Sequence, residues 1–179
     1  MEKEPHQVAQ TAASEQRVSA IVVAYSIKWP RSGQAPLDLC LRSALAENWV
    51  EEVIVVDVDN APSVSSALRA LQADRRDVRV IRAETGASRA AAANLGAKHA
   101  RGRWLLFLSP DVVLQRGAAM RLANACAGDA LDGPWIAGGR LTDLEGHDRC
   151  DVRKGSLNAF SSVAVALDWR ARKPAPRPR

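Results

Sequence analysis

Three carboxylates in this 179-residue chain follow short apolar runs and are candidates for chemistry: Asp57, Asp59 and Asp111. Like charges that the fold brings to one place cost free energy unless a cation or a hydrogen-bond donor compensates them. A hard divalent cation, Mg²⁺ or Mn²⁺, takes oxygen ligands and keeps coordination positions open for phosphate oxygens. These residue types therefore indicate a cation-assisted site for a phosphate-bearing ligand, with Asp111 as the best metal ligand.

Alternating apolar runs and helical patterns extend from about residue 17 to residue 169. The predicted strands span residues 18–24, 53–56, 78–81 and 104–108. The first of these runs is β-branched and continuous, as is typical of a strand covered on both faces. Helices are expected to open at Pro36 and Pro62 and to span 89–100 and about 117–126. Four strand–helix units in succession predict an α/β domain with a mostly parallel sheet and, through right-handed crossovers, helices on both faces.

The ends of the third predicted helix carry two local signals. Ser88 is a typical N-cap residue for a helix that begins at Arg89. Gly102 is expected to end that helix in a left-handed cap.

Ligands of open parallel sheets bind beyond the carboxyl ends of the strands. The residues that follow the predicted strands there are Tyr25, Ser26, Asp57, Asp59, Asn60, Ser109, Pro110 and Asp111. No glycine-rich phosphate loop accompanies them, because Gly33 is the only glycine in residues 26–36. The charge of a bound diphosphate would therefore be met by a cation at Asp111 and by Arg89, in the first turn of its helix.

Each of these residues also has a structural interpretation. Asp57, Asp59 and Asn60 are suited to cap the helix that opens beside them. Asp111 fits ordinary turn chemistry after a proline, and Arg89 fits a solvated helix surface. Taken together at one sheet edge, the same residues favour a ligand site.

Other reactive residue types are interpreted as structural. Tyr25 is suited to half-buried packing, and Trp29 to a partly buried loop anchor rather than a sugar-stacking surface. His99 and His147 have no partners at ligand spacing. The cysteines, expected to fill the core, are Cys40, Cys126 and Cys150.

The composition, 47% hydrophobic and 25% charged, suits one soluble globular domain. No apolar run reaches the roughly 18 residues of a membrane-spanning helix, the polar start does not resemble a signal peptide, and three scattered cysteines indicate a reduced, cytoplasmic protein.

Residues 170–179 carry five basic residues and no acid, so the net charge of +5 belongs to them. We expect a disordered segment 1–16, a domain 17–169 and a basic tail 170–179 that is solvated or contacts a membrane surface; no nucleic acid is expected.

The motifs, in order, resemble the donor-binding half of family 2 glycosyltransferases, which have the GT-A fold. The resemblance covers residues 18–114. Its pieces are Ala24-Tyr25-Ser26, the helix segment 39–45, Asp57-Val58-Asp59-Asn60, Asn94-Leu95-Gly96-Ala97 and the acidic strand end Ser109-Pro110-Asp111. Residues 136–146 also look like a segment of rhamnosyltransferase-type members.

The resemblance implies a nucleotide-diphospho-sugar donor of the UDP or dTDP type. The backbone around Tyr25 and the Asp57 side chain would hold the base, with Asp57 accepting from a ring N–H. Asp111 would hold Mg²⁺ or Mn²⁺ against the diphosphate. The other substrate-binding residues expected are Ala24, Asp59, Arg89, Asn94 and Ser109.

The reaction that this resemblance implies is an inverting transfer of the sugar to an acceptor. The cation acts as a Lewis acid on the leaving diphosphate, and a carboxylate base removes the acceptor proton. Only 68 residues follow Asp111, so we expect the acceptor half to be missing and assign no base. The alternatives are an inactive remnant that binds a nucleotide or a partner, and a membrane-surface adaptor that uses Trp169 and the tail.

Overall fold

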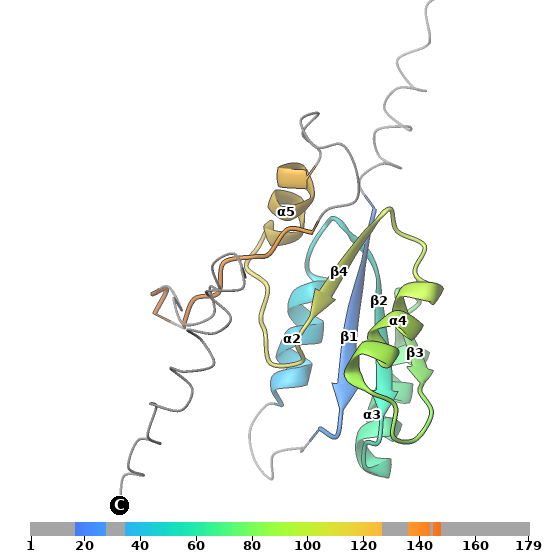
Figure 1. Cartoon of the computed structure of the whole chain (residues 1–179). Coiled ribbons are helices and arrows are strands. Elements are labelled where there is room, and N and C mark those ends of the chain that lie inside the picture. Colours follow the sequence, from blue (N-terminus) through green and yellow to red (C-terminus); the bar gives the residue numbers. More distant parts are fainter. Residues whose placement is uncertain (1–16, 28–34, 127–135, 144, 148–179) are drawn as a thin grey trace, which may run out of the picture. The chain divides into compact units, whose positions relative to one another are not determined.

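The computed structural model describes residues 17–27, 35–126, 136–143 and 145–147. The chain divides into two compact units, Met1–Ala137 and Gly138–Arg179. The helices and strands of the described part all belong to the first unit (Figure 1) and are, in chain order, β1 (Val18–Tyr25), α2 (Pro36–Leu45), β2 (Val50–Val58), α3 (Pro62–Asp74), β3 (Val78–Arg82), α4 (Arg89–His99), β4 (Trp104–Leu108) and α5 (Ala118–Cys126). The expected end segments 1–16 and 170–179 lie outside the described residues, and the domain limits 17–169 remain a prediction.

The four strands form one parallel sheet in the order β3-β2-β1-β4. Ala24 of β1 pairs with Asp57 of β2, and Val22 of β1 pairs with Leu108 of β4. In chain order, β2 and then β3 are added on one side of β1, and β4 is added on the other side. The carboxyl ends of β1 and β4 flank this switch point, which is where parallel sheets bind ligands.

Helices cover both faces of the sheet, as the sequence predicts (Figure 1). On one face, α2 and α3 bury Leu37, Leu41 and Val64 against the strands. On the other face, α4 packs on β1 and β2, and the contact is close because Gly96 has no side chain. A Cβ at Gly96 would lie 2.6 Å from Cγ2 of Ile21.

The helix ends follow the sequence signals with one exception. Pro36 and Pro62 occupy the first turns of α2 and α3, and Ser88 caps α4 by accepting a hydrogen bond from Ala91 N. The expected left-handed cap at Gly102 is wrong, because α4 ends at His99, its C-cap residue Ala100 has φ −71°, and Gly102 has no positive φ. Gly102 is instead required by close packing, since a Cβ there would lie 2.6 Å from the backbone N of Ser19.

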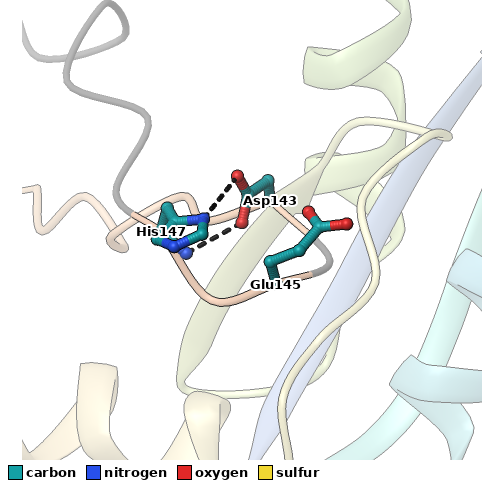
Figure 2. Close-up of side chains that lie close together, drawn as sticks. All are labelled: Asp143, Glu145 and His147. Atoms are coloured by element: carbon teal, nitrogen blue, oxygen red, sulfur yellow. Dashed lines mark hydrogen bonds and ion pairs between the residues drawn. The ribbon is translucent and has the colours of Figure 1, made fainter.

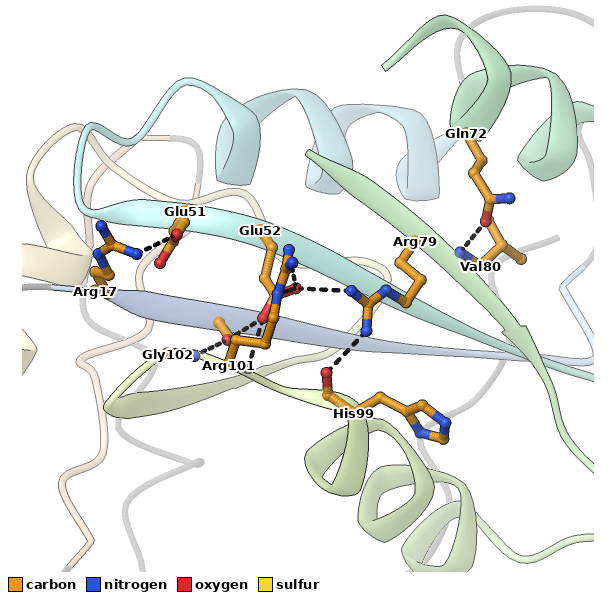
Figure 3. Close-up of polar contacts among 10 residues, drawn as sticks. Arg17, Glu51, Glu52, Gln72, Arg79, Val80, His99, Arg101 and Gly102 are labelled. Atoms are coloured by element: carbon orange, nitrogen blue, oxygen red, sulfur yellow. Dashed lines mark hydrogen bonds and ion pairs between the residues drawn. The ribbon is translucent and has the colours of Figure 1, made fainter. Parts of the chain in front are cut away.

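A buried carboxylate organises the edge of the sheet at the amino ends of its strands (Figure 3). Glu52, on β2, is 2% exposed. Its carboxylate accepts hydrogen bonds from Ser19 Oγ at 2.7 Å and Arg101 N at 2.7 Å, and it forms ion pairs with Arg101 and Arg79. Ser19 Oγ in turn accepts from Gly102 N at 2.8 Å. This cluster joins β1, β2, β3 and the turn before β4.

None of the helices in the described ranges has the length and apolar character needed to cross a bilayer.

Candidate functional site

An asparagine links the carboxyl ends of β1 and β2. The Asn60 Nδ2 group donates to Ala24 O and to Asp57 Oδ1, both at 2.6 Å, and Asn60 Oδ1 accepts from Ile27 N at 2.6 Å. Asp57 is only 5% exposed, so its carboxylate is held in one place with the Oδ2 atom left for another partner. Sequence reasoning placed Asn60 among the residues beyond the strand ends, with helix capping as the alternative, but did not predict that it links Ala24 to Asp57.

The helix-capping interpretation of this segment is wrong. The N-cap residue of α3 is Ala61, and no side chain caps that helix. Asp59 instead adopts a left-handed conformation, φ 49°, and its Oδ2 accepts a hydrogen bond from Gly86 N at 3.0 Å. Asp59 therefore joins the end of β2 to the turn before α4, which places the start of α4 beside the site.

Tyr25 and Arg89, both expected at the site, are in contact. The Arg89 guanidinium lies over the Tyr25 ring at 5.5 Å from the centroid, in cation–π geometry. Tyr25 is half-buried and Arg89 is exposed. Arg89 forms no ion pair with an acid of the described ranges, so its charge at the start of α4 is available to an anion.

Asp111 lies in a tight turn directly after β4. Val112 N donates to Ser109 O at 3.1 Å, and the Ser109 hydroxyl donates to Asp111 Oδ1. The residues around Asp111 therefore form a turn, as expected, and this turn engages only the Oδ1 atom of the carboxylate. Asp111 is exposed, and within the part of the chain that the structure describes it has no cationic partner.

The uncompensated charge of Asp111 also affects its neighbour. Burial raises the pKa of the Cys40 thiol to about 12, and the negative charge of Asp111 adds to the rise. Cys40, on α2, is fully buried, as expected of a core residue. Cys126 has no described side chain, and Cys150 and Trp29 lie outside the described residues.

The oxygen atoms at this edge suit a cation that is bound partly by the protein and partly by a ligand, rather than one enclosed by protein groups. Asp111 supplies an exposed carboxylate with a hydroxyl beside it, and Asp57 is already bonded to Asn60. Strands β2 and β4 lie on either side of β1, so their ends are about 10 Å apart. A cation at Asp111 would therefore complete its coordination with oxygens of a ligand, as Mg²⁺ does with phosphates.

Asn94 is not joined to the other expected residues. It is exposed on α4 and makes no hydrogen bond within the described ranges.

Two hollows of about 330 and 320 Å³ are found on the described surface, and none of the expected site residues lines either of them. Neither hollow belongs to the expected site, and the roles of its residues remain predictions.

The second unit contains a cluster that the sequence interpretation missed (Figure 2). Ligand atoms of Asp143, Glu145 and His147 lie within 4.8 Å of one another. The expectation that His147 lacks partners at ligand spacing is therefore wrong, because alternate residues meet in a turn. In that turn Gly146 N donates to Asp143 O at 3.1 Å, and Gly146 has φ 88°. His99 Nδ1 lies 2.9 Å from Leu95 O, and its structural role stays a prediction.

Solved structures similar to this chain share its fold. A mannosyltransferase, PcManGT from Pyrobaculum calidifontis in complex with GDP-Man and Mn²⁺, matches with a TM-score of 0.54 and 22% identity over 64% of this chain and 33% of that one. The 4-diphosphocytidyl-2C-methyl-D-erythritol synthase from Anaerococcus prevotii matches with a TM-score of 0.50 and 14% identity over 77% and 64%. TarS 1-349 of S. aureus has a TM-score of 0.48 and 21% identity over 62% and 31%.

The likeness to the mannosyltransferase shows the GT-A fold of the described part. The chain spans about a third of the length of the mannosyltransferase and of TarS 1-349. No curated protein sequence matches it. The model of one protein family, described as glycosyl transferase family 2, matches residues 19–140, which include every expected site residue from Ala24 to Asp111. This chain therefore belongs to glycosyl transferase family 2.

Proposed function

We propose that this chain is the donor-binding part of a glycosyltransferase that binds a nucleotide-diphospho-sugar of the UDP or dTDP type together with Mg²⁺ or Mn²⁺. The observation that carries the proposal is the placement of Asp111. It is an exposed carboxylate without a cationic partner in the described ranges, at the switch point of a parallel sheet. Membership of family 2 supports the same conclusion.

The nucleotide base would be held at the ends of β1 and β2. Asn60 orients the Asp57 carboxylate through Oδ1, so that Oδ2 can accept a hydrogen bond from a ring N–H. The same amide bonds Ala24 O, which keeps the end of β1 at a constant distance from Asp57. A pyrimidine with a donating ring nitrogen, as in uridine or thymidine, matches this acceptor.

The diphosphate would lie between Arg89 and Asp111. Arg89 offers charge-assisted hydrogen bonds at the start of α4, where the helix dipole favours an anion. Asp111 would hold the cation, with the Ser109 hydroxyl fixing the orientation of the carboxylate. A bound Mg²⁺ or Mn²⁺ supplies Lewis acidity at the leaving diphosphate.

The transfer itself needs groups that we do not assign to this chain. We propose an inverting displacement, in which a base takes the acceptor proton as the sugar leaves the diphosphate. The groups that bind the acceptor, and the base, would come from a part that corresponds to the other two thirds of the mannosyltransferase. A domain that binds the nucleotide without turnover is the alternative.

The experiment is a titration of the full chain with UDP and with dTDP, with and without MnCl₂, by calorimetry. We expect binding that depends on Mn²⁺ and weakens at least about tenfold in Asp111→Asn, because a first ligand to the cation is lost. The control is Asp74→Asn, which removes an exposed carboxylate at the end of α3, away from the site. Equal Mn²⁺-dependent binding by Asp111→Asn and the native chain would refute the cation site.

Release of sugar from a UDP-sugar then separates the two alternatives. Turnover that depends on Mn²⁺ and disappears in Asp111→Asn indicates an active donor site. Tight nucleotide binding without any release, with and without candidate acceptors, indicates a binding domain.

A further inference from the structure

The loop that carries Asp111 is held at three points by α2 and by a residue just after its end. Residues 109–117 connect β4 to α5 and run beside α2 (Figure 1). Three residues of α2 and its end, Cys40, Ser43 and Glu47, contact this loop. Cys40 and Ser43, three residues apart, lie on one face of α2, and Glu47 follows two residues after the helix ends at Leu45.

Glu47 makes the strongest of these attachments. It is 5% exposed, and its two carboxylate oxygens accept hydrogen bonds from Gly117 N at 2.6 Å and Ala119 N at 3.0 Å. These amides belong to the start of α5, where backbone N–H groups lack partners within the helix and a negative charge is favourable. A buried acid of one element thus caps the helix that ends the Asp111 loop.

Ser43 and Cys40 hold the loop closer to Asp111. Ser43 Oγ accepts from Leu114 N at 3.0 Å and donates to Cys40 O at 2.8 Å. The Cys40 thiol donates to Ser109 O at 3.4 Å, two residues before Asp111. The attachments therefore follow the loop from the start of α5 back to the turn that presents the carboxylate.

We propose that Glu47, with Ser43, is a positioning residue for the Asp111 carboxylate, so that the buried cap of α5 sets the cation affinity of the opposite end of the loop. This inference rests on the proposed function, because the cation at Asp111 is part of that proposal. Asp111 is itself exposed and bonded only by its neighbour Ser109 among the described residues. Its position therefore depends on the loop backbone, which β4 and the Ser109 turn hold on one side and Ser43 and Glu47 hold on the other.

The test compares Glu47→Gln and Ser43→Ala with the native full chain. A glutamine keeps the size of Glu47 but turns an N–H₂ group toward one of the two amides, so one hydrogen bond is lost. The control is Glu51→Gln, which removes a carboxylate that pairs with Arg17 at the surface. Mn²⁺ affinity is measured by electron paramagnetic resonance with UDP present in every sample, and exchange of the amides of Leu114, Gly117 and Ala119 by NMR.

We expect Glu47→Gln to weaken Mn²⁺ binding about 10- to 100-fold, the range found when groups that orient a metal ligand are removed. Ser43→Ala should weaken it less, and Glu51→Gln should leave it unchanged. Exchange at Gly117 and Ala119 should become faster in Glu47→Gln. A purely structural role would leave Mn²⁺ affinity intact.

The outcomes separate the two proposals. If the native chain binds no Mn²⁺, the cation step of the proposed function fails, and the positioning role falls with it. If the native chain binds Mn²⁺ and Glu47→Gln binds it equally well, whatever the amide exchange, the positioning role alone is overturned. If Glu47→Gln does not fold, Ser43→Ala decides in the same way through Mn²⁺ affinity and exchange at Leu114.

Discussion

The two edges of the sheet use their carboxylates in opposite ways. Glu52, at the amino ends of the strands, is buried and receives a hydroxyl, a backbone amide and two guanidinium groups. Asp111, at the carboxyl ends, is exposed and receives only the hydroxyl of Ser109 among the described residues. Both carboxylates are close to backbone turns. They differ in the number of donors and cations that offset their negative charge.

The contrast shows how to separate a structural acid from a candidate ligand. A buried charge is tolerated only when partners replace the water it has lost, and Glu52 has such partners from three segments of the chain. Removing it should therefore damage folding. An exposed acid without a cation adds little to folding, so removing Asp111 should affect ligand binding alone.

Replacing one glycine at each edge of the sheet should give the largest difference in the free energy of unfolding between the two edges. In Gly102→Ala the new Cβ would meet the Ser19 N and the Val18 C at 2.6 and 2.9 Å, and backbone cannot move aside easily. We expect a loss of about 3 kcal/mol in the free energy of unfolding. In Gly86→Ala, at the other edge, there is open space but φ is +77°, so the loss should be about 1 kcal/mol. Urea denaturation measures both, and equal losses would contradict the assignment of Gly102 to close packing.

The acids themselves test the contrast directly. Glu52→Gln should lower the free energy of unfolding by about 2 kcal/mol, because the amide turns a donor toward groups that are themselves donors. Asp111→Asn should stay within about 0.5 kcal/mol of the native chain. Urea denaturation at pH 7 measures both variants. Comparable destabilisation by the two substitutions would show that Asp111 is also a structural acid.

The pH dependence of stability sharpens the same point with a smaller effect. Burial by itself would raise the pKa of Glu52, but the hydrogen bonds from Ser19 and Arg101 and the charge of Arg101 together hold it below its ordinary value of 4.5. A group with a lowered pKa in the folded state stabilises the fold above its unfolded pKa and loses this contribution as the pH falls through the folded value. The native chain should therefore lose stability below about pH 4.5. Glu52→Gln should show a shallower loss, and identical slopes in urea unfolding between pH 6 and pH 3 would contradict this role of Glu52.

Local sequence signals predicted most of the elements. Pro36 and Pro62 marked helix starts because their missing N–H groups are not needed in the first turn, and Ser88 marked another because its hydroxyl replaces a missing acceptor. Gly102 misled the prediction, since a glycine after a helix is typical both of a left-handed cap and of close packing. Only the position of Ser19, 83 residues earlier in the chain, distinguishes the two.

The candidate site was predicted in its residue types but not in its connections. The placement of Tyr25, Asp57 and Asp111 after apolar strands was sufficient to bring them to one edge, since parallel strands end together. The role of Asn60 and the contact of Arg89 with Tyr25 were not predicted, because both depend on side-chain directions at the ends of neighbouring elements.

Strand patterns, helix starts and the acidic strand ends are properties of short segments, and the amino-acid sequence therefore decided the fold class and the edge where a ligand would bind. The attachment of the Asp111 loop to α2 and the burial of Glu47 and Glu52 were decided only by the tertiary structure. The physical reason is that a carboxylate becomes structural or available according to the partners that distant segments bring to it. Sequence spacing does not record those partners.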